Sequence, residues 1–224
     1  MDRSKLQVKL RRVEKAINAF LAPYNLKIER CEIEIGESLE EGALASHRYP
    51  NRILVKREDV AESIVAHELV HVVQGTLEVF KGFRWLYSLL SEGLAEFIAK
   101  SLYPEHDVKY ELHYELISIL YGIDRNIVEE IVNINYLPLS PSDVDELLNS
   151  PHVSPYSKGI IKDQADHLRN NIRRAMNAKI TDPTFISYGE DLRAWKFLIN
   201  QKFDPKRREI NEILEAYFET ASVT

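Results

Sequence analysis

The segment AHELVH at 66–71 places two histidines, His67 and His71, four positions apart. On an α-helix, residues four apart leave the same face about one turn from each other, so both imidazoles can reach one ion. Zinc accepts two imidazoles in this way, and its catalytic sites add a third protein ligand and leave a fourth position to water. Glu68 stands beside that position, where its carboxylate could take a proton from the water and pass it to a leaving amine. The H-E-x-x-H spacing therefore predicts a metallopeptidase site.

The apolar residues around this motif argue against an ordinary solvent-exposed helix. They are spread over most of the helix circumference and comprise Ile64, Val65, Leu69, Val70, Val72 and Val73. A helix that is apolar nearly all round is expected to be buried. Burying two imidazoles and a carboxylate without partners would be costly, so metal binding is the favoured explanation.

The third ligand decides the class of zinc site. No histidine occupies the metzincin position, because His71 is followed by VVQGTL, and the next histidine in the chain is His106. A carboxylate is therefore the natural candidate. The segment SEGLAEF at 91–97 supplies two of them, Glu92 and Glu96.

With HELVH followed by SEGLAEF, the sequence resembles the gluzincin metallopeptidases, in which a helix with an E-G-x-A-E-like or E-x-x-x-D-like pattern follows the HExxH helix. The resemblance implies one zinc ion, with Glu92 as its third ligand. It also implies that Gly93 lets this helix approach the first one closely. Glu96, one turn after Glu92, would then orient a histidine ligand. The alternative is that Glu92 and Glu96 exchange these roles.

The segment SPYSKG at 154–159 resembles the P-Y-x-K-G segment of the aminopeptidase-N-like gluzincins. The tyrosine of that segment stabilises the oxyanion, and the resemblance implies this role for Tyr156. Donation of its hydroxyl to the tetrahedral intermediate would contribute roughly 10²–10³ in rate. His152 and His167 are alternatives for the same role, and packing of Tyr156 against the core is the structural alternative.

The segment EGALAS at 41–46 precedes the motif helix, where gluzincins have the strand that rims the cleft. An exposed edge strand could pair with an extended substrate through main-chain hydrogen bonds. The chain departs from the G-x-M-E-N signature with which the aminopeptidases anchor a substrate's amino terminus. The resemblance therefore indicates a peptidase without assigning internal or terminal cleavage.

The remaining sequence predicts a small sheet followed by helices. Apolar residues at helical spacing indicate a first helix before Pro23, and alternation indicates strands within 26–35. The segments 42–46 and 52–55 could supply two further short strands, separated by the turn-forming Tyr49-Pro50-Asn51. Asp59 and Glu62 form a D-x-x-E capping box for the motif helix, which Gly75 can end. Further helices are expected at 91–103, 107–121, 124–134, 142–149, 156–178, 190–201 and 206–221.

Composition and charge narrow the class of protein. With 224 residues, 45% of them hydrophobic and 29% charged, the chain has the composition of a soluble globular protein. Cys31 cannot form an internal disulfide, and the N-terminal segment lacks the apolar run of a signal peptide, which favours a cytoplasmic protein. No segment is apolar enough to span a bilayer. The net charge of −6 argues against nucleic-acid binding as the main task.

The other conspicuous side chains are expected to have structural or surface roles. They are a basic patch of Arg169, Arg173, Arg174 and Lys179, the aromatic residues Phe83, Trp85 and Tyr87, and the histidines His47, His106 and His113.

Taken together, these features predict an α+β, zincin-like fold in a single domain over 1–224. An N-terminal lobe of about 1–78 would contain a small mixed sheet and the HExxH helix, and a mainly helical C-terminal lobe would cover about 79–224. The expected function is zinc-dependent hydrolysis of peptide or protein substrates, with Glu68 as general base and acid. The alternative is an inactive or latent zinc-binding protein that acts as a binding or regulatory module.

Overall fold

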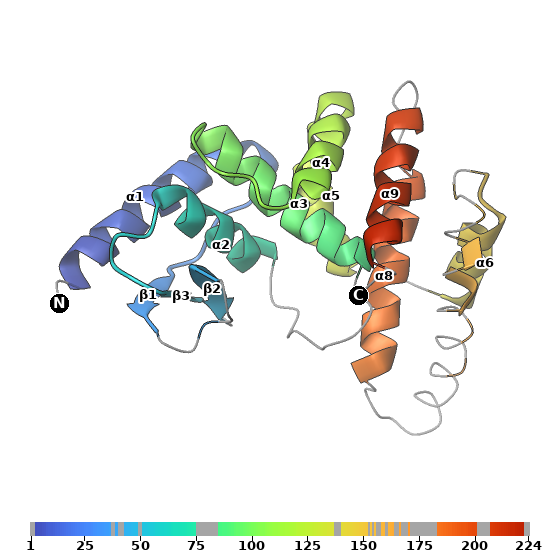
Figure 1. The fold of residues 1–224 in the computed structure, drawn as a ribbon, viewed down its shortest axis with the longest axis horizontal. Coiled ribbons are helices and arrows are strands. Elements are labelled where there is room, and N and C mark those ends of the chain that lie inside the picture. Colours follow the sequence, from blue (N-terminus) through green and yellow to red (C-terminus); the bar gives the residue numbers. More distant parts are fainter. Residues whose placement is uncertain are drawn as a thin grey trace. The chain divides into compact units, whose positions relative to one another are not determined.

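The computed structural model describes residues 3–36, 39, 43–48, 51–74, 85–136, 140–151, 183–200 and 207–221, together with 153, 155, 158, 159, 161–163, 166 and 170. Within these ranges the chain forms a three-stranded sheet near its N-terminus, and helices account for most of the rest (Figure 1). The α+β class predicted from the sequence is confirmed.

The chain divides into two compact units. The first comprises Met1–Glu78, Ser91–Ser118 and Asn126–Val132, and the second comprises Val79–Leu90, Ile119–Arg125 and Asn133–Thr224. The HELVH and SEGLAEF segments both belong to the first unit, so the candidate site can be described within that unit alone. The expected single domain, with lobes at about 1–78 and 79–224, stays a prediction.

The sheet of the first unit is mixed. β1 (Glu32–Ile35) runs parallel to the central strand β3 (Arg52–Val55), and β2 (Ala45–Arg48) pairs antiparallel with the other side of β3. The predicted mixed sheet is therefore confirmed, with β2 displaced towards the C-terminus from the expected 42–46. Among the described residues, β2 pairs with β3 alone, so its other side can meet groups from elsewhere in the unit.

The alternating residues before β1 do not extend the strand. Their main-chain N–H groups donate instead to side chains of the first helix: that of Ile28 to Asn18 Oδ1 at 2.7 Å, and that of Cys31 to Glu14 Oε1 at 3.1 Å. These bonds satisfy amides that a strand would otherwise pair with a neighbour. The strand predicted within 26–35 is therefore shortened to its last four residues.

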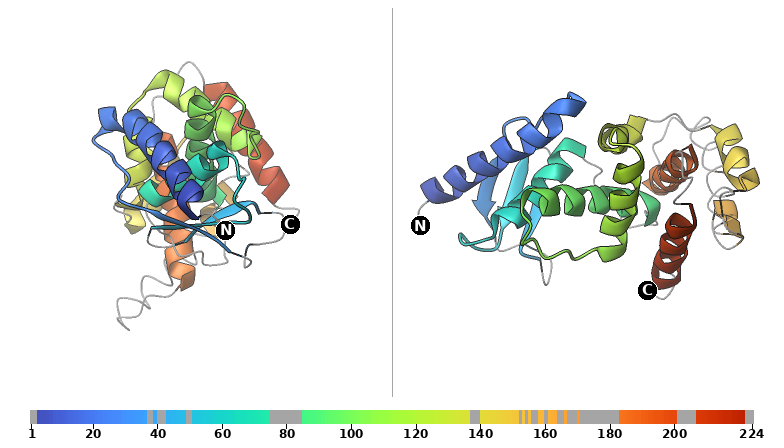
Figure 2. Two further views of the ribbon diagram at one scale, coloured as in Figure 1. Left: turned by 90° about the vertical axis from the view of Figure 1, so that its left-hand side faces the viewer. Right: turned by 90° about the horizontal axis from the view of Figure 1, so that it is seen from above.

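Two helices pack against each other and on the sheet, α1 (Arg3–Leu21) over β1 and α2 (Glu62–Gln74) over β2 (Figures 1 and 2). α1 buries the predicted apolar stripe, including Leu6, Leu10 and Ile17. α2 carries the HELVH motif. Its buried residues are Ser63, Val65, Ala66, Leu69, Val70 and Gln74, and the motif histidines are half-buried.

The predicted capping box of α2 is wrong. The helix begins at Glu62, and its first main-chain N–H groups donate to the oxygen of Ala61. Ala61 is therefore the N-cap residue, two positions after Asp59, which the predicted box requires as the N-cap. Asp59 pairs with Arg57, with Oδ1 2.9 Å from Nε. Glu62 pairs with Arg12 of α1 at 2.7 Å. Both carboxylates are therefore engaged by arginines rather than by helix N–H groups.

The remaining helices largely follow the sequence-based expectations. They are α3 (Trp85–Leu102), α4 (Glu111–Ile123), α5 (Ile127–Val132), α6 (Pro141–Asn149), α8 (Pro183–Asn200) and α9 (Arg207–Ala221). α8 begins at Pro183 rather than near 190, because a proline is tolerated at the first position of a helix. Most of the helix expected at 156–178 lies outside the described residues. No helix in the described ranges is long and apolar enough to cross a membrane.

In the second unit, α6 packs against α8. The Lys196 ammonium of α8 lies 2.5 Å from a carboxylate oxygen of Asp143 in α6, and both side chains are mostly buried. Asp143 also accepts the main-chain N–H of Ser140, which closes a capping box at the start of α6. The same carboxylate thus joins two helices and caps one of them.

Candidate metal centre

Three side-chain atoms from α2 and α3 converge in the first unit. The Nε2 atoms of His67 and His71 are 3.2 Å apart. Glu92 Oε2 lies 3.2 Å from the first nitrogen and 3.4 Å from the second. Two imidazole nitrogens and one carboxylate oxygen therefore form a nearly equilateral triangle, and the structure brings together the three residues predicted to bind zinc.

The size of this triangle fits a zinc ion. With zinc–nitrogen and zinc–oxygen bonds of about 2.0–2.2 Å in a tetrahedron, ligand atoms are about 3.3–3.5 Å apart. The three edges of 3.2, 3.2 and 3.4 Å agree with that spacing. The side chains retain 13, 16 and 26% of their exposure for His67, His71 and Glu92, so solvent can reach the group. This donor set suits a zinc ion that keeps one position for water.

The charges of the triangle are strongly coupled. Burial by itself would lower the pKa of His71, but the charge and hydrogen bond of Glu92, helped by Glu68, raise the pKa to about 9. Burial would raise the pKa of Glu92, but the imidazoles of His71 and His67 hold it well below its ordinary value. Both shifts favour an imidazolium–carboxylate pair between His71 and Glu92. A metal ion would replace that proton, because a ligating histidine must be neutral.

Gln74 fixes the orientation of His71. The Gln74 side-chain oxygen lies 2.8 Å from His71 Nδ1 and accepts the Ser91 hydroxyl at 2.8 Å, while its amide nitrogen donates to the main-chain oxygen of Ser91 at 3.0 Å. Since an amide oxygen only accepts, Nδ1 carries the proton and Nε2 is left with a lone pair for a metal. Neither Gln74 nor Ser91 was predicted to belong to the site, although the H-x-x-Q spacing places Gln74 on the same helix face as His71.

Glu96 lies behind His67, away from the triangle. Its side chain is 1% exposed, and Oε1 is 3.9 Å from Nδ1 of His67, the ring nitrogen that does not belong to the triangle. The other oxygen, Oε2, is 2.7 Å from His106 Nε2, and Oε1 accepts the main-chain N–H of Lys109 at 3.1 Å. The geometry favours Glu92 as the ligand and Glu96 as its outer neighbour, rather than the exchanged assignment.

His106 was expected to have a structural or surface role, but it belongs to the surroundings of the site. The side chain is 6% exposed and contacts the carboxylate of Glu96. His106 comes after the end of α3, so a chain reversal is needed to bring it back to the helix. Nothing in its sequence spacing signals this contact.

Gly93 permits a close helix contact, but with α4 rather than with the motif helix. A Cβ at this position would lie 2.5 Å from the main-chain oxygen of His113 and 2.7 Å from Ile117 Cγ1. The expected role of Gly93 in the approach of α3 to α2 is corrected accordingly. The contact brings His113 near the acidic pair, where burial lowers its pKa while Glu92 and Glu96 oppose that shift.

Glu68, the predicted base, faces the sheet edge. Its Oε2 accepts the main-chain N–H of His47 in β2 at 2.7 Å. His47 is paired with Ile53 in the antiparallel register of β2 and β3. Its main-chain N–H donates to Glu68 of α2, which shows that this N–H points away from β3. This hydrogen bond from the edge strand thus restricts the position of the Glu68 carboxylate.

Several predicted residues lie outside the described residues. They are the oxyanion candidates Tyr156, His152 and His167 and the basic patch Arg169, Arg173, Arg174 and Lys179.

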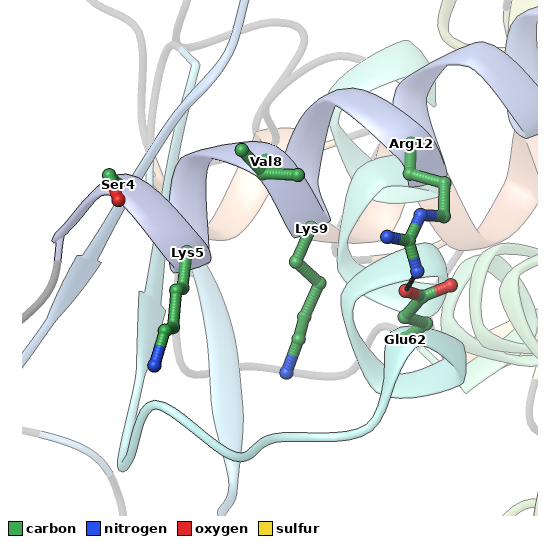
Figure 3. A pocket seen from close by; sticks show the side chains of 6 residues that line it. All are labelled: Ser4, Lys5, Val8, Lys9, Arg12 and Glu62. Carbon is green, nitrogen blue, oxygen red and sulfur yellow. Dashed lines mark hydrogen bonds and ion pairs between the residues drawn. The ribbon is translucent and has the colours of Figure 1, made fainter.

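A cavity of about 270 Å³ lies in the first unit (Figure 3), and none of His67, His71 and Glu92 lines it. It is lined by Ser4, Lys5, Val8, Lys9, Arg12 and Glu62. Arg12 is paired with Glu62 at 2.7 Å, and the Lys9 ammonium donates to the main-chain oxygens of Glu58 and Val60 at 3.1 and 2.5 Å. These contacts join α1 to the start of α2, and we assign the cavity a structural origin.

No family model matches the chain, and neither a search of curated proteins nor a search of solved structures finds a match. The functional argument therefore depends on the site itself.

Proposed function

We propose that the protein is a zinc-dependent peptidase with a zincin-like, gluzincin-type site, in which His67, His71 and Glu92 hold one zinc ion. The observation that carries the proposal is the triangle of donor atoms with edges of 3.2, 3.2 and 3.4 Å. Its three donors come from the two segments, HELVH and SEGLAEF, on which the resemblance to gluzincins rests. Two imidazoles and one carboxylate are a ligand set of catalytic zinc sites.

Zinc with an open position supplies Lewis acidity and makes water a nucleophile near neutral pH. Glu68 would accept a proton from the attacking water and would deliver it to the leaving nitrogen of the cleaved bond. Its position on α2, directly after His67, supports this role. The hydrogen bond from the His47 amide occupies Oε2 and restricts the carboxylate, so that Oε1 remains to exchange the proton.

The edge strand β2 supports an extended peptide as substrate. β2 lies at one side of the sheet, and its outward-facing amide at His47 is already directed to the base. Because the His47 N–H already donates to Glu68, an extended peptide would lie beside this edge without using that amide, with a scissile bond close to Glu68. Tyr156 is proposed as the group that stabilises the oxyanion, on the resemblance of SPYSKG alone.

The substitution Glu68→Gln tests this mechanism. The variant should retain zinc in equimolar amount, measured by atomic emission, because residue 68 lies outside the donor triangle. Cleavage of a mixed peptide library, followed by mass spectrometry, should fall to background, since an amide cannot serve as the base. Glu62→Gln, which removes a carboxylate from the same helix, is the matched control and should leave cleavage intact.

Three outcomes separate the alternatives. Cleavage that persists in Glu68→Gln contradicts the mechanism. A wild-type protein that binds zinc but cleaves nothing in the library supports the zinc-binding module. Cleavage that appears only after proteolytic trimming supports a latent enzyme. For an active enzyme, a chelator should abolish cleavage and added zinc should restore it.

A further inference from the structure

The chain segment after α3 folds back onto that helix. It brings His106 to the Nδ1 side of His67, away from the donor triangle. Lys100, in the last turn of α3, donates its ammonium to the main-chain oxygens of Pro104 and His106, both at 2.7 Å. The His106 amide also donates to the oxygen of Tyr103 at 2.8 Å. These bonds define the path of the reversal, and the imidazole of His106 ends 6.4 Å from that of His67, measured between ring centroids.

Glu96 connects the two imidazoles. One carboxylate oxygen lies 2.7 Å from His106 Nε2, and the other accepts the Lys109 amide at 3.1 Å while facing His67 Nδ1 at 3.9 Å. A carboxylate only accepts hydrogen bonds, so the His106 ring nitrogen is the donor. With both oxygens engaged and the side chain 1% exposed, the carboxylate has one orientation available.

Glu96 and His106 form a hydrogen-bonded pair rather than a second metal site, and His67 lies next to this pair without a hydrogen bond to it. Two ligands of a tetrahedral zinc ion are about 3.3–3.5 Å apart, whereas the 2.7 Å between His106 Nε2 and Glu96 Oε2 is the length of a charge-assisted hydrogen bond. The 3.9 Å gap from Glu96 to His67 is longer than a hydrogen bond. A hydrogen bond between Glu96 and His67 Nδ1 would require the two side chains to come closer than they are in this structure.

We propose that His106 is a positioning residue: it holds Glu96 so that the carboxylate accepts the Nδ1 proton of His67 and leaves Nε2 for zinc. This inference rests on the proposed zinc site. Outer carboxylates that fix the tautomer of a ligating histidine commonly change metal affinity by about 10–100-fold. Without the His106 donor, the Glu96 carboxylate can turn away from His67, and the ring is no longer held in the ligating orientation.

Zinc affinity, measured by competition with a chromophoric chelator, tests the role of His106. His106→Ala should weaken zinc binding about 10-fold, the lower end of the range for an outer partner. His106→Gln should restore most of the affinity, because its amide nitrogen can donate to Glu96 from a similar position. If His106→Ala does not fold, His106→Gln and His106→Leu provide the same comparison of a donor with a non-donor.

A double-mutant cycle with Glu96→Ala distinguishes positioning from general support of the fold. If His106 acts through Glu96, His106→Ala should change affinity little further once Glu96 is replaced. An equal loss in both backgrounds, or unchanged affinity in His106→Ala while the wild type binds zinc, overturns the inference and leaves the proposed function standing. A wild type that binds no zinc overturns both.

The unfolding midpoint of the metal-free variants is the control for structural damage. A positioning role predicts that His106→Ala and His106→Gln differ in zinc affinity by more than their metal-free stabilities differ. If the loss of affinity follows the loss of stability across both variants, the contact between His106 and Glu96 is structural only.

Discussion

Each ring nitrogen of His67 faces one histidine and one glutamate. The two pairs differ in their exposure to solvent and in the distances between their atoms. On the Nε2 side, His71 and Glu92 lie at 3.2 Å from that nitrogen and remain partly exposed, with 16 and 26% of their side-chain surface accessible. On the Nδ1 side, Glu96 and His106 are 1 and 6% exposed and are 2.7 Å apart. We call these the front group and the rear group.

The comparison shows that residue type alone does not make a metal site. In the front group, the three donor atoms lie 3.2–3.4 Å from one another, which is also the spacing of ligands around a zinc ion. In the rear group, His106 and the Lys109 amide already satisfy Glu96. Ion-binding donors need a shared vacancy and solvent access, whereas a buried hydrogen-bonded pair needs neither.

Replacing the carboxylate of each group should give the largest contrast. Glu92→Ala should weaken zinc binding by more than about 100-fold, because it removes a ligand, whereas Glu96→Ala should weaken it by about 10–100-fold as an outer partner. Chelator competition measures both values. The reverse order of losses would mean that Glu96 is the ligand and that the assignment of front and rear must be exchanged.

Gly93 lies between Glu92 and Glu96 in α3. Its substitution tests the close contact between α3 and α4 that supports both groups. Gly93→Ala places a Cβ 2.5 Å from the rigid main-chain oxygen of His113, so we expect a loss of about 1–3 kcal/mol in the free energy of unfolding. Urea denaturation of the metal-free protein measures this loss.

Gly122 in α4 provides the matched control. A Cβ there meets no atom within 4 Å among the described residues, so Gly122→Ala should be neutral or stabilising by up to about 1 kcal/mol. Equal effects of the two substitutions would show that the close approach of α3 to α4 does not require a glycine.

Gln74 should give the smallest effect, because it is an outer partner of the front group. Gln74→Ala removes the acceptor of the His71 Nδ1 proton and should weaken zinc binding about 10-fold, at the lower end for such partners. Gln74→Glu keeps an acceptor oxygen and should retain the affinity better than alanine does. Chelator competition applies again, and equal losses in the two variants would argue that Gln74 acts through its packing alone.

Much of the fold could be predicted because its signals are local. The apolar spacing of α1 and the alternation that ends in β1 reflect which side chains face the core, and the structure confirms both elements. The errors occurred where a side chain from elsewhere competed with the local pattern. The side chains of Asn18 and Glu14 accept hydrogen bonds from main-chain N–H groups that were expected to extend β1. Asp59 and Glu62 of the expected capping box form ion pairs with arginines instead.

The sequence by itself determined that His67 and His71 share a helix face and that Glu68 lies beside them, because a helix repeats every 3.6 residues. It also offered two carboxylates, Glu92 and Glu96, without separating them. Only the tertiary structure decided which of them meets the Nε2 atoms, since this depends on how α3 is placed against α2. The tertiary structure likewise brought His106 to Glu96. The sequence could not predict this contact, because a contact across a chain reversal leaves no periodic signal in the sequence.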